Sequence, residues 1–261
     1  WSPIGDQIAF LSDRKLRRIS ASGGTPVEIC DVPFGGLRRA VWTTDGTIFF
    51  LVATGGATSE VFVVPEQGGA AESFMRSSDN TNLYTFLDIG LMPDGKTLVL
   101  ATQASNTDES RVDWLTVSPE KNTQPLFSVD GIGASYTTYS ATGHMLFARD
   151  GAIWAVSLTE SNAVGQPFRV ASQAGKPSVS ESGTLVYQAI TSGILRDATV
   201  LGSQMISRES ELVWVDRSGG VTGSIGLSDG QVFDPVVSED VSRIAVHYDG
   251  DVWLYAADRD A

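Results

Sequence analysis

A short turn sequence recurs six times along the chain and constrains the fold more than any other feature. Each copy places an aromatic or aliphatic residue before a small polar turn, and five of the six turns end on glycine. The residues at this turn position are Gly5, Gly46, Gly95, Gly143, Gly183 and Val241. Successive copies are separated by 41, 49, 48, 40 and 58 residues, which is the spacing expected for the four-stranded blades of a β-propeller.

The residues around each turn are typical of β-strands. In the second copy, Thr47–Val52 is rich in β-branched and aromatic residues. The residues of Glu60–Val64 alternate as expected for a strand with one face toward the core and one toward solvent. Gln67–Gly69 then turns toward a fourth strand, and glycine suits such a tight connection because it accepts positive φ. We therefore predict an all-β fold, a β-propeller of four-stranded antiparallel blades with six repeats visible.

The predicted repeats occupy the whole chain as one domain or part of one. Their approximate ranges are 1–30, 38–75, 84–127, 135–170, 175–226 and 232–261. The pattern lacks most of a first strand at its start and a fourth strand at its end, so the first and last blades are predicted to be incomplete. Because exposed strand edges invite pairing, we expect a neighbouring chain or residues outside this segment, such as additional blades, to close the ring.

One connection departs from the repeat. Ile190–Ser210 lengthens the link between the second and third strands of the fifth copy. Long loops in compact domains are usually functional or mobile. Two alternatives follow for this segment: a hairpin packed on its own blade or partly disordered, or a contact arm or lid over the channel.

The charge and composition exclude several classes of partner. A net charge of −13, from 18 basic and 31 acidic residues, disfavours nucleic acid, whose binding depends on Lys and Arg contacts to phosphate. It disfavours anionic membrane surfaces for the same reason. No run of about 18 apolar residues occurs, so we expect no membrane insertion within this segment. Cys30 is the single cysteine, which excludes an internal disulfide and predicts a small core residue.

Motifs that suggest catalysis or metal binding lie in the wrong context. Gly226–Gly230 has the G-x-S-x-G pattern of a hydrolase, but such a serine needs a helix after it, and Val232–Val237 is predicted to be a strand. The two histidines and one cysteine lie far apart, which disfavours zinc. Asp249–Asp251 and Ser78–Asn82 are more typical of polar turns than of calcium loops. We predict that the segment is not an enzyme and has no catalytic residues, metal site or cofactor.

The candidate binding residues lie where the first strands of the blades begin, on the usual ligand-facing surface of a propeller. They are Arg38, Arg39, Tyr84, Tyr136, Lys176 and Asp234. Arginine and tyrosine anchor partners well, through forked hydrogen bonds and rigid amphipathic area. The alternative is that these side chains only fill or hydrate the axial channel.

Several motifs resemble those of a known family. Trp1–Gly5 followed by Ile8–Phe10 is similar to the W-S-P-D-G turn and I-A-F strand of TolB-type propeller repeats, with Ile4 in place of the turn Asp. Lys15–Ile19, Trp42–Ile48 and Leu212–Gly219 resemble the C-terminal propeller of bacterial serine/threonine protein kinases. The resemblance implies a WD-like repeat protein whose propeller lies on the periplasmic or extracellular face.

These observations together predict a function. We expect a non-catalytic propeller that recognises a protein, peptide or cell-envelope ligand, as the extracytoplasmic sensor or scaffold of a larger bacterial protein that resembles a propeller-bearing kinase. The alternatives are the gating propeller of a prolyl-oligopeptidase-like hydrolase, a propeller lyase or hydrolase with its site in the axial channel, and a purely structural module.

Overall fold

The structure is a computed structural model of the 261-residue chain. It describes residues 1–55, 58–79, 84–104, 111–130, 134–159, 163–189, 213–215, 221–224, 232–248 and 251–257. Regular structure in these ranges is antiparallel β-strand, apart from one 3₁₀ turn, η1 (Ser77–Asp79). The all-β prediction is confirmed.

The chain divides into two compact units. The first is Trp1–Tyr139 with Glu160–Ala163, and the second is Ser140–Thr159 with Val164–Ala261. The prediction of a single domain stays a prediction.

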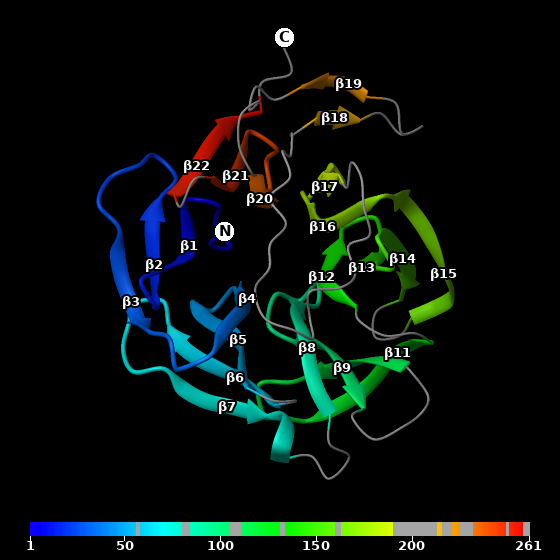
Figure 1. Ribbon diagram of the computed structural model, residues 1–261, viewed down its shortest axis with the longest axis horizontal. Helices are drawn as coiled ribbons and strands as arrows, with labels where there is room; N and C mark the ends of the chain where they lie inside the picture. The colour runs from blue at the N-terminus through cyan, green and yellow to red at the C-terminus, as the bar shows by residue number, and fades with distance from the viewer. Residues whose placement is uncertain are drawn as a thin grey trace. The chain divides into compact units, whose positions relative to one another are not determined.

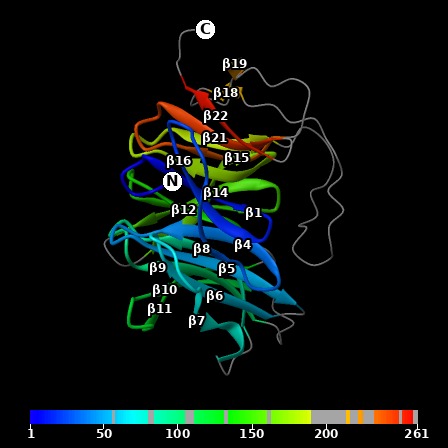
Figure 2. The ribbon, with the colours of Figure 1, turned by 90° about the vertical axis from the view of Figure 1, so that its left-hand side faces the viewer.

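The sheets of the first unit contain consecutive strands in chain order, as the colour gradient of Figure 1 shows. The first sheet has three strands, β1 (Gln7–Ser12), β2 (Lys15–Ser20) and β3 (Val27–Asp31). The second has four: β4 (Gly36–Trp42), β5 (Thr47–Gly55), β6 (Thr58–Pro65) and β7 (Glu72–Arg76). The third also has four: β8 (Tyr84–Leu91), β9 (Leu98–Ala104), β10 (Arg111–Val117) and β11 (Thr123–Asp130). The second and third sheets, both labelled in Figure 2, share a buried cluster that includes Phe49 of β5 and Ile89 of β8.

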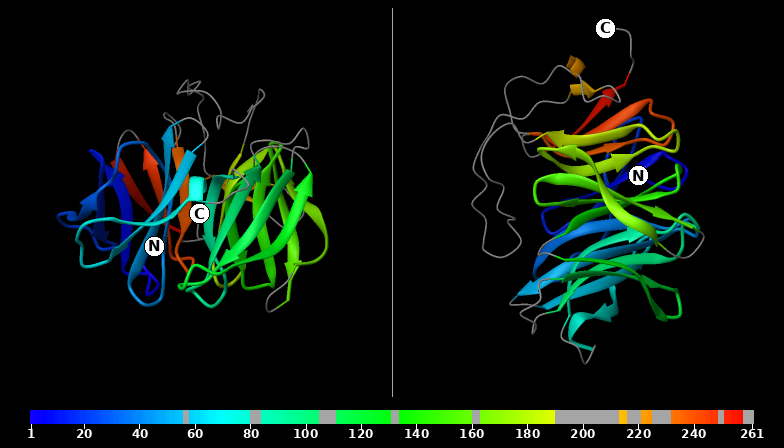
Figure 3. Two further views of the ribbon diagram at one scale, coloured as in Figure 1. Left: turned by 90° about the horizontal axis from the view of Figure 1, so that it is seen from below. Right: turned by 90° about the vertical axis from the view of Figure 1, so that its right-hand side faces the viewer.

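The remaining sheets continue the same order. The fourth sheet has four strands, β12 (Ser135–Ser140), β13 (His144–Arg149), β14 (Ala152–Leu158) and β15 (Ala163–Ser172). The main segment of the first unit ends within β12, at Tyr139, and these strands are coloured green to yellow-green in Figure 3. Two short pairs follow, β16 (Ala174–Val179) with β17 (Leu185–Ala189), and β18 (Val213–Val215) with β19 (Val221–Ser224). The last described sheet is β20 (Val232–Val237), β21 (Arg243–Tyr248) and β22 (Asp251–Ala256). The predicted four-stranded blades are confirmed, with three strands described in the first and last sheets.

The recurring turn has the same geometry in all six copies. The backbone N–H at the turn position donates to the carbonyl three residues earlier, at 2.8–3.1 Å. The five glycines have φ between 65° and 82°, and Val241 has φ of 62°. A β-branched residue in this region is a conformational outlier. The repeat therefore imposes its backbone geometry even where glycine has been lost.

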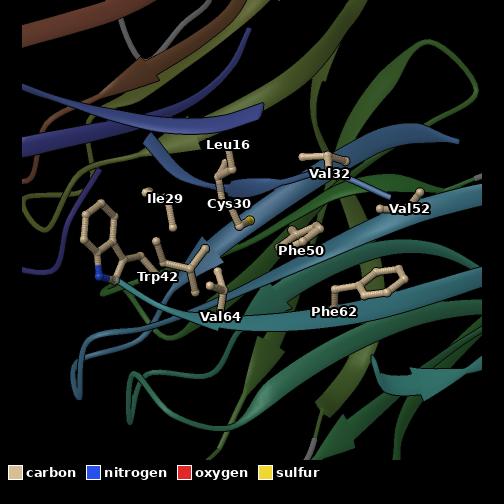
Figure 4. Packing of buried hydrophobic residues seen from close by; sticks show 10 residues of the cluster. Leu16, Ile29, Cys30, Val32, Trp42, Phe50, Val52, Phe62 and Val64 are labelled. Carbon is tan, nitrogen blue, oxygen red and sulfur yellow. The ribbon is translucent and has the colours of Figure 1, made fainter. Parts of the chain in front are cut away.

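Cores form where neighbouring sheets of the first unit face each other. Leu16, Cys30, Trp42, Phe50 and Val64 belong to a buried cluster that joins the first and second sheets, shown in Figure 4. Each fully buried side chain of this size contributes about 1.5–3 kcal/mol by leaving water. The prediction that Cys30 is a small core residue is confirmed, since it is 4% exposed.

Several predicted segments lie outside the described residues. They include Ile190–Ser210, Gly226–Gly230 and most of the Asp249–Asp251 and Ser78–Asn82 turns. Val232–Val237 does form a strand, β20, as predicted. Within the described ranges no helix has the length and apolarity needed to cross a membrane.

Candidate binding site on the first strands

Counting back from the recurring turn places one residue of each first strand in the same register. The residues seven positions before the turn are Arg39, Asp88, Tyr136, Lys176 and Asp234. They lie on β4, β8, β12, β16 and β20. All five are charged or aromatic, and we call them the first-strand row. Blades that share one turn thus also share one register position that carries a charged or aromatic side chain.

The sequence prediction found four of these five residues. It missed Asp88 and chose Tyr84, which begins β8 four residues earlier and whose side chain lies outside the described residues. Arg38 precedes the row on β4, where it is partly buried and its Nε has no hydrogen-bond partner in the described part of the chain. A strict count of seven residues back from Gly95 would have identified Asp88.

Four of the five first strands carry a pairing irregularity at the row. The shifts fall between Leu37 and Arg39, Phe86 and Asp88, Gly175 and Ser178, and Phe233 and Val236. Such bulges redirect a side chain relative to the regular alternation of a strand. The direction of each of these row side chains is therefore set by the local bulge as well as by the regular alternation of the strand.

Three members of the row have left-handed backbone conformations. Tyr136, Lys176 and Asp234 have φ of 58°, 51° and 49°. Lys176 and Asp234 also precede Pro177 and Pro235, and a following proline restricts the backbone further. Each residue held in this conformation lowers the stability of the fold by about 1–3 kcal/mol, and such strained residues are found most often at functional sites.

In the first unit, the row forms a buried ion pair. Arg39 Nη1 lies 3.1 Å from Asp88 Oδ2, with the Asp88 side chain 4% exposed and the Arg39 side chain 24% exposed. The backbone N–H of Thr137 donates to the same oxygen, and Trp114 Nε1 donates to Thr137 Oγ1 at 3.1 Å. Asp88 thus links β4, β8 and β12. Burial raises the pKa of this carboxyl, and the Arg39 charge and the Thr137 N–H offset part of that rise.

In the second unit, the row forms a more open ion pair. Lys176 Nζ lies 2.6 Å from Asp234 Oδ1, and the two side chains are 22% and 57% exposed. Ser178 Oγ accepts a hydrogen bond from the backbone N–H of Val237 at 3.1 Å, which fixes β16 against β20 beside the pair. An ion pair this exposed contributes only about 0–1 kcal/mol. It can therefore exchange its partner for a ligand at little cost to the fold.

The two pairs offer different chemistry. The buried Arg39–Asp88 pair holds neighbouring strands together, whereas the Lys176–Asp234 pair presents an ammonium group and a carboxylate on a fixed backbone. These groups could bind the charged groups of a peptide or act on a proton. Within the described ranges no three residues among His, Cys, Asp and Glu are grouped closely enough to hold a metal ion.

No protein-family model and no curated protein matches this chain, but several solved structures share its fold. TolB from Acinetobacter baumannii has 13% identity and a TM-score of 0.66 over 97% of this chain and 61% of that one. A putative TolB from Agrobacterium tumefaciens has 21% identity and a TM-score of 0.58 over 98% and 87%. A gluconolactonase from Xanthomonas campestris has 11% identity and a TM-score of 0.68 over 98% and 84%.

The gluconolactonase match contradicts the prediction that the segment is not an enzyme. An enzyme shares this fold over nearly the whole chain, so the absence of a known catalytic motif is no argument against activity. The physical reason is that turns and strands specify a propeller, whereas activity depends on the few side chains that the blades present. The prediction rested on motifs that lie in the wrong context for catalysis, and such motifs do not decide whether a propeller is active.

At these identities the matches establish the fold alone. This chain spans 61% of the A. baumannii TolB and 87% of the A. tumefaciens protein. The chain has a TolB-like β-propeller fold.

Proposed function

We propose that the chain is a recognition propeller that binds a protein or peptide ligand through members of the first-strand row, chiefly Lys176 and Asp234 of the second unit. The observation that carries this proposal is the recurrence of charged or aromatic side chains at one register position of five first strands. Pairing irregularities and left-handed backbone conformations hold these positions in place. A rigid site loses little order on binding, which favours affinity.

The Lys176–Asp234 pair is the part of the row that is best placed to bind. Its carboxylate is more than half exposed, and its ammonium group is held 2.6 Å away. A peptide could place a carboxylate on Lys176 and a cationic group on Asp234, so that both charges keep a partner. The buried Arg39–Asp88 pair is proposed to fix the strands on which other contacts depend.

We further propose that the chain acts on the periplasmic or extracellular face, as the sensor or scaffold of a larger bacterial protein. Support comes from the bacterial TolB proteins that share its fold. It also comes from the resemblance of Lys15–Ile19 and Trp42–Ile48 to kinase-linked propellers.

A second candidate function is lactone hydrolysis. The observation that favours it is the similarity to a gluconolactonase over 98% of this chain. In that case a row carboxylate such as Asp234 would act on a proton, which requires no change in the site described above.

The test of the recognition proposal is selection from a phage-displayed heptapeptide library, followed by affinity measurement on single peptides. The double variant Lys176→Ala with Asp234→Ala is expected to weaken the selected peptides at least tenfold. The matched control is Lys15→Ala with Glu28→Ala, which removes an exposed ion pair outside the row. Failure to select peptides, or equal effects of the two double variants, would refute the proposal.

The same proteins distinguish the second candidate. The wild-type chain is assayed for hydrolysis of glucono-δ-lactone with and without added divalent metal. Hydrolysis that is lost in Asp234→Asn but retained in the Lys15 and Glu28 control would establish the enzymatic alternative.

A further inference from the structure

We propose that the chain carries a second docking surface at the end of its first sheet, for an acidic protein segment with a large apolar side chain. The surface is formed by Arg14 and Phe34, with Leu11 near the end of β1, the strand that precedes Arg14, and we call it the Arg14–Phe34 patch. The inference rests on the proposed role of the chain in recognition, and it names the chemistry of a partner.

The patch exposes side chains that usually make interfaces. Phe34 is 80% exposed and Leu11 is 43% exposed. The guanidinium carbon of Arg14 lies 5.2 Å from the centre of the Phe34 ring, within the range of a cation–π contact. Aromatic residues and arginine are enriched among the residues that dominate binding energy.

The backbone fixes Phe34 in its outward position. Gly35, directly after it, has φ of 143°, and a Cβ there would lie 2.3 Å from the carbonyl oxygen of Ala53. The chain at this point is therefore pressed against β5. The backbone N–H of Val32 donates to the Arg14 carbonyl at 2.8 Å, which joins the hairpin turn to the segment that carries Phe34. The backbone that carries Arg14 and Phe34 is therefore held in place without a partner.

Arg14 occupies a position that suits glycine. Asp13 and Arg14 connect β1 to β2 and have φ of 51° and 60°. A two-residue turn with both φ values positive strongly prefers Asn-Gly or Asp-Gly. An arginine at the second position strains the backbone, so its presence indicates that the side chain has a use outside the fold.

The local charge indicates an acidic partner. Residues 11–34 contain four basic and three acidic residues, in a chain of net charge −13. The three acidic residues already have cationic neighbours, because Lys15 pairs with Glu28 and Asp31 and Arg17 pairs with Asp13. A carboxylate for Arg14 is therefore expected from a partner, next to an apolar group that covers Phe34.

The probe is a fluorescein-labelled peptide with two glutamates on each side of a central Leu-Trp, and the matched probe has glutamine in place of glutamate. Fluorescence anisotropy is expected to show at least tenfold tighter binding of the glutamate peptide. Phe34→Ala and Arg14→Gly should each weaken that binding at least tenfold. Ile4→Ala is the control, because Ile4 is also 80% exposed but precedes the opposite end of β1.

Arg14→Gly has a second readout. Because glycine fits the turn, this variant should unfold at a higher temperature than wild type while it binds the peptide more weakly. The proposal is overturned if the two peptides bind equally or not at all, or if Ile4→Ala loses as much affinity as Phe34→Ala. Lys176→Ala with Asp234→Ala should leave this binding unchanged, so failure at the row and failure at the patch can be told apart.

Discussion

Loss of the Asp88 carboxylate is predicted to weaken the first unit strongly. Asp88→Ala removes the acceptor for the Arg39 guanidinium and for the backbone N–H of Thr137. Breaking a buried pair by removing one partner costs about 3–5 kcal/mol. The Arg39 side chain is 24% exposed, so water hydrates its charge in part. We therefore expect Asp88→Ala to lower the free energy of unfolding by about 3 kcal/mol, at the low end of that range.

A double-mutant cycle separates the ion pair from simple loss of packing. Arg39→Met leaves Asp88 buried without its counter-charge and should cost a similar amount. The double variant Arg39→Met with Asp88→Leu buries no charge and should be clearly more stable than the sum of the two single losses. The coupling energy is expected to reach about 1.5 kcal/mol or more, as for residues in direct contact.

The assay is urea unfolding followed by tryptophan fluorescence. Trp114 is fully buried and donates to Thr137 beside the pair, so it reports on the same strands. A loss below about 1 kcal/mol in Asp88→Ala, or additive losses in the cycle, would show that the pair does not hold the first strands together.

Two further predictions concern single groups. Hydrogen bonds from Ser238 and Ser242 lower the pKa of Asp240 from 3.8 to about 2, so its stabilising contribution is present above pH 3.8 and is lost as the pH falls through about 2. Asp240→Asn should remove this part of the acid dependence of the unfolding midpoint, and an unchanged pH profile would contradict it. Burial raises the pKa of the Cys30 thiol to about 11. A disulfide reagent at pH 8 should therefore label Cys30 only as fast as the protein unfolds. Rapid labelling of the folded protein would contradict this, because it would show that the thiol is accessible.

The blades were predictable because their signal is local. Each turn spans a few residues and repeats six times, so the spacing of Gly46, Gly95 and the other copies outweighs any single irregularity. Even Val241, which lacks the glycine, keeps the turn hydrogen bond at 3.0 Å. The predicted core position of Cys30 followed from the same apolar pattern.

The candidate site was harder to predict because its contacts are distant in sequence. Lys176 and Asp234 are 58 residues apart, and Arg39 and Asp88 are 49 apart. Strand patterns do not show which side chains of neighbouring sheets meet, nor where a bulge redirects one of them. For the blade that holds Asp88 the prediction named Tyr84, at the start of the strand, because it did not count a fixed distance back from Gly95. The prediction that the segment is not an enzyme failed because binding and catalytic propellers share the same turns, so the turns do not separate the two classes.

The recurring turn and the first-strand row should follow different rules during evolution. The hydrogen bond that closes each turn joins residues three positions apart, so a substitution at the closing position acts first on its own copy, even though the Thr44 N–H also donates to the Gly95 carbonyl at 3.0 Å and links two copies. The ion pairs of the row join different copies, so a charge lost from one blade removes the partner of another. Among relatives of this chain, turn residues should therefore vary one at a time, whereas positions 39 and 88, and positions 176 and 234, should vary in pairs.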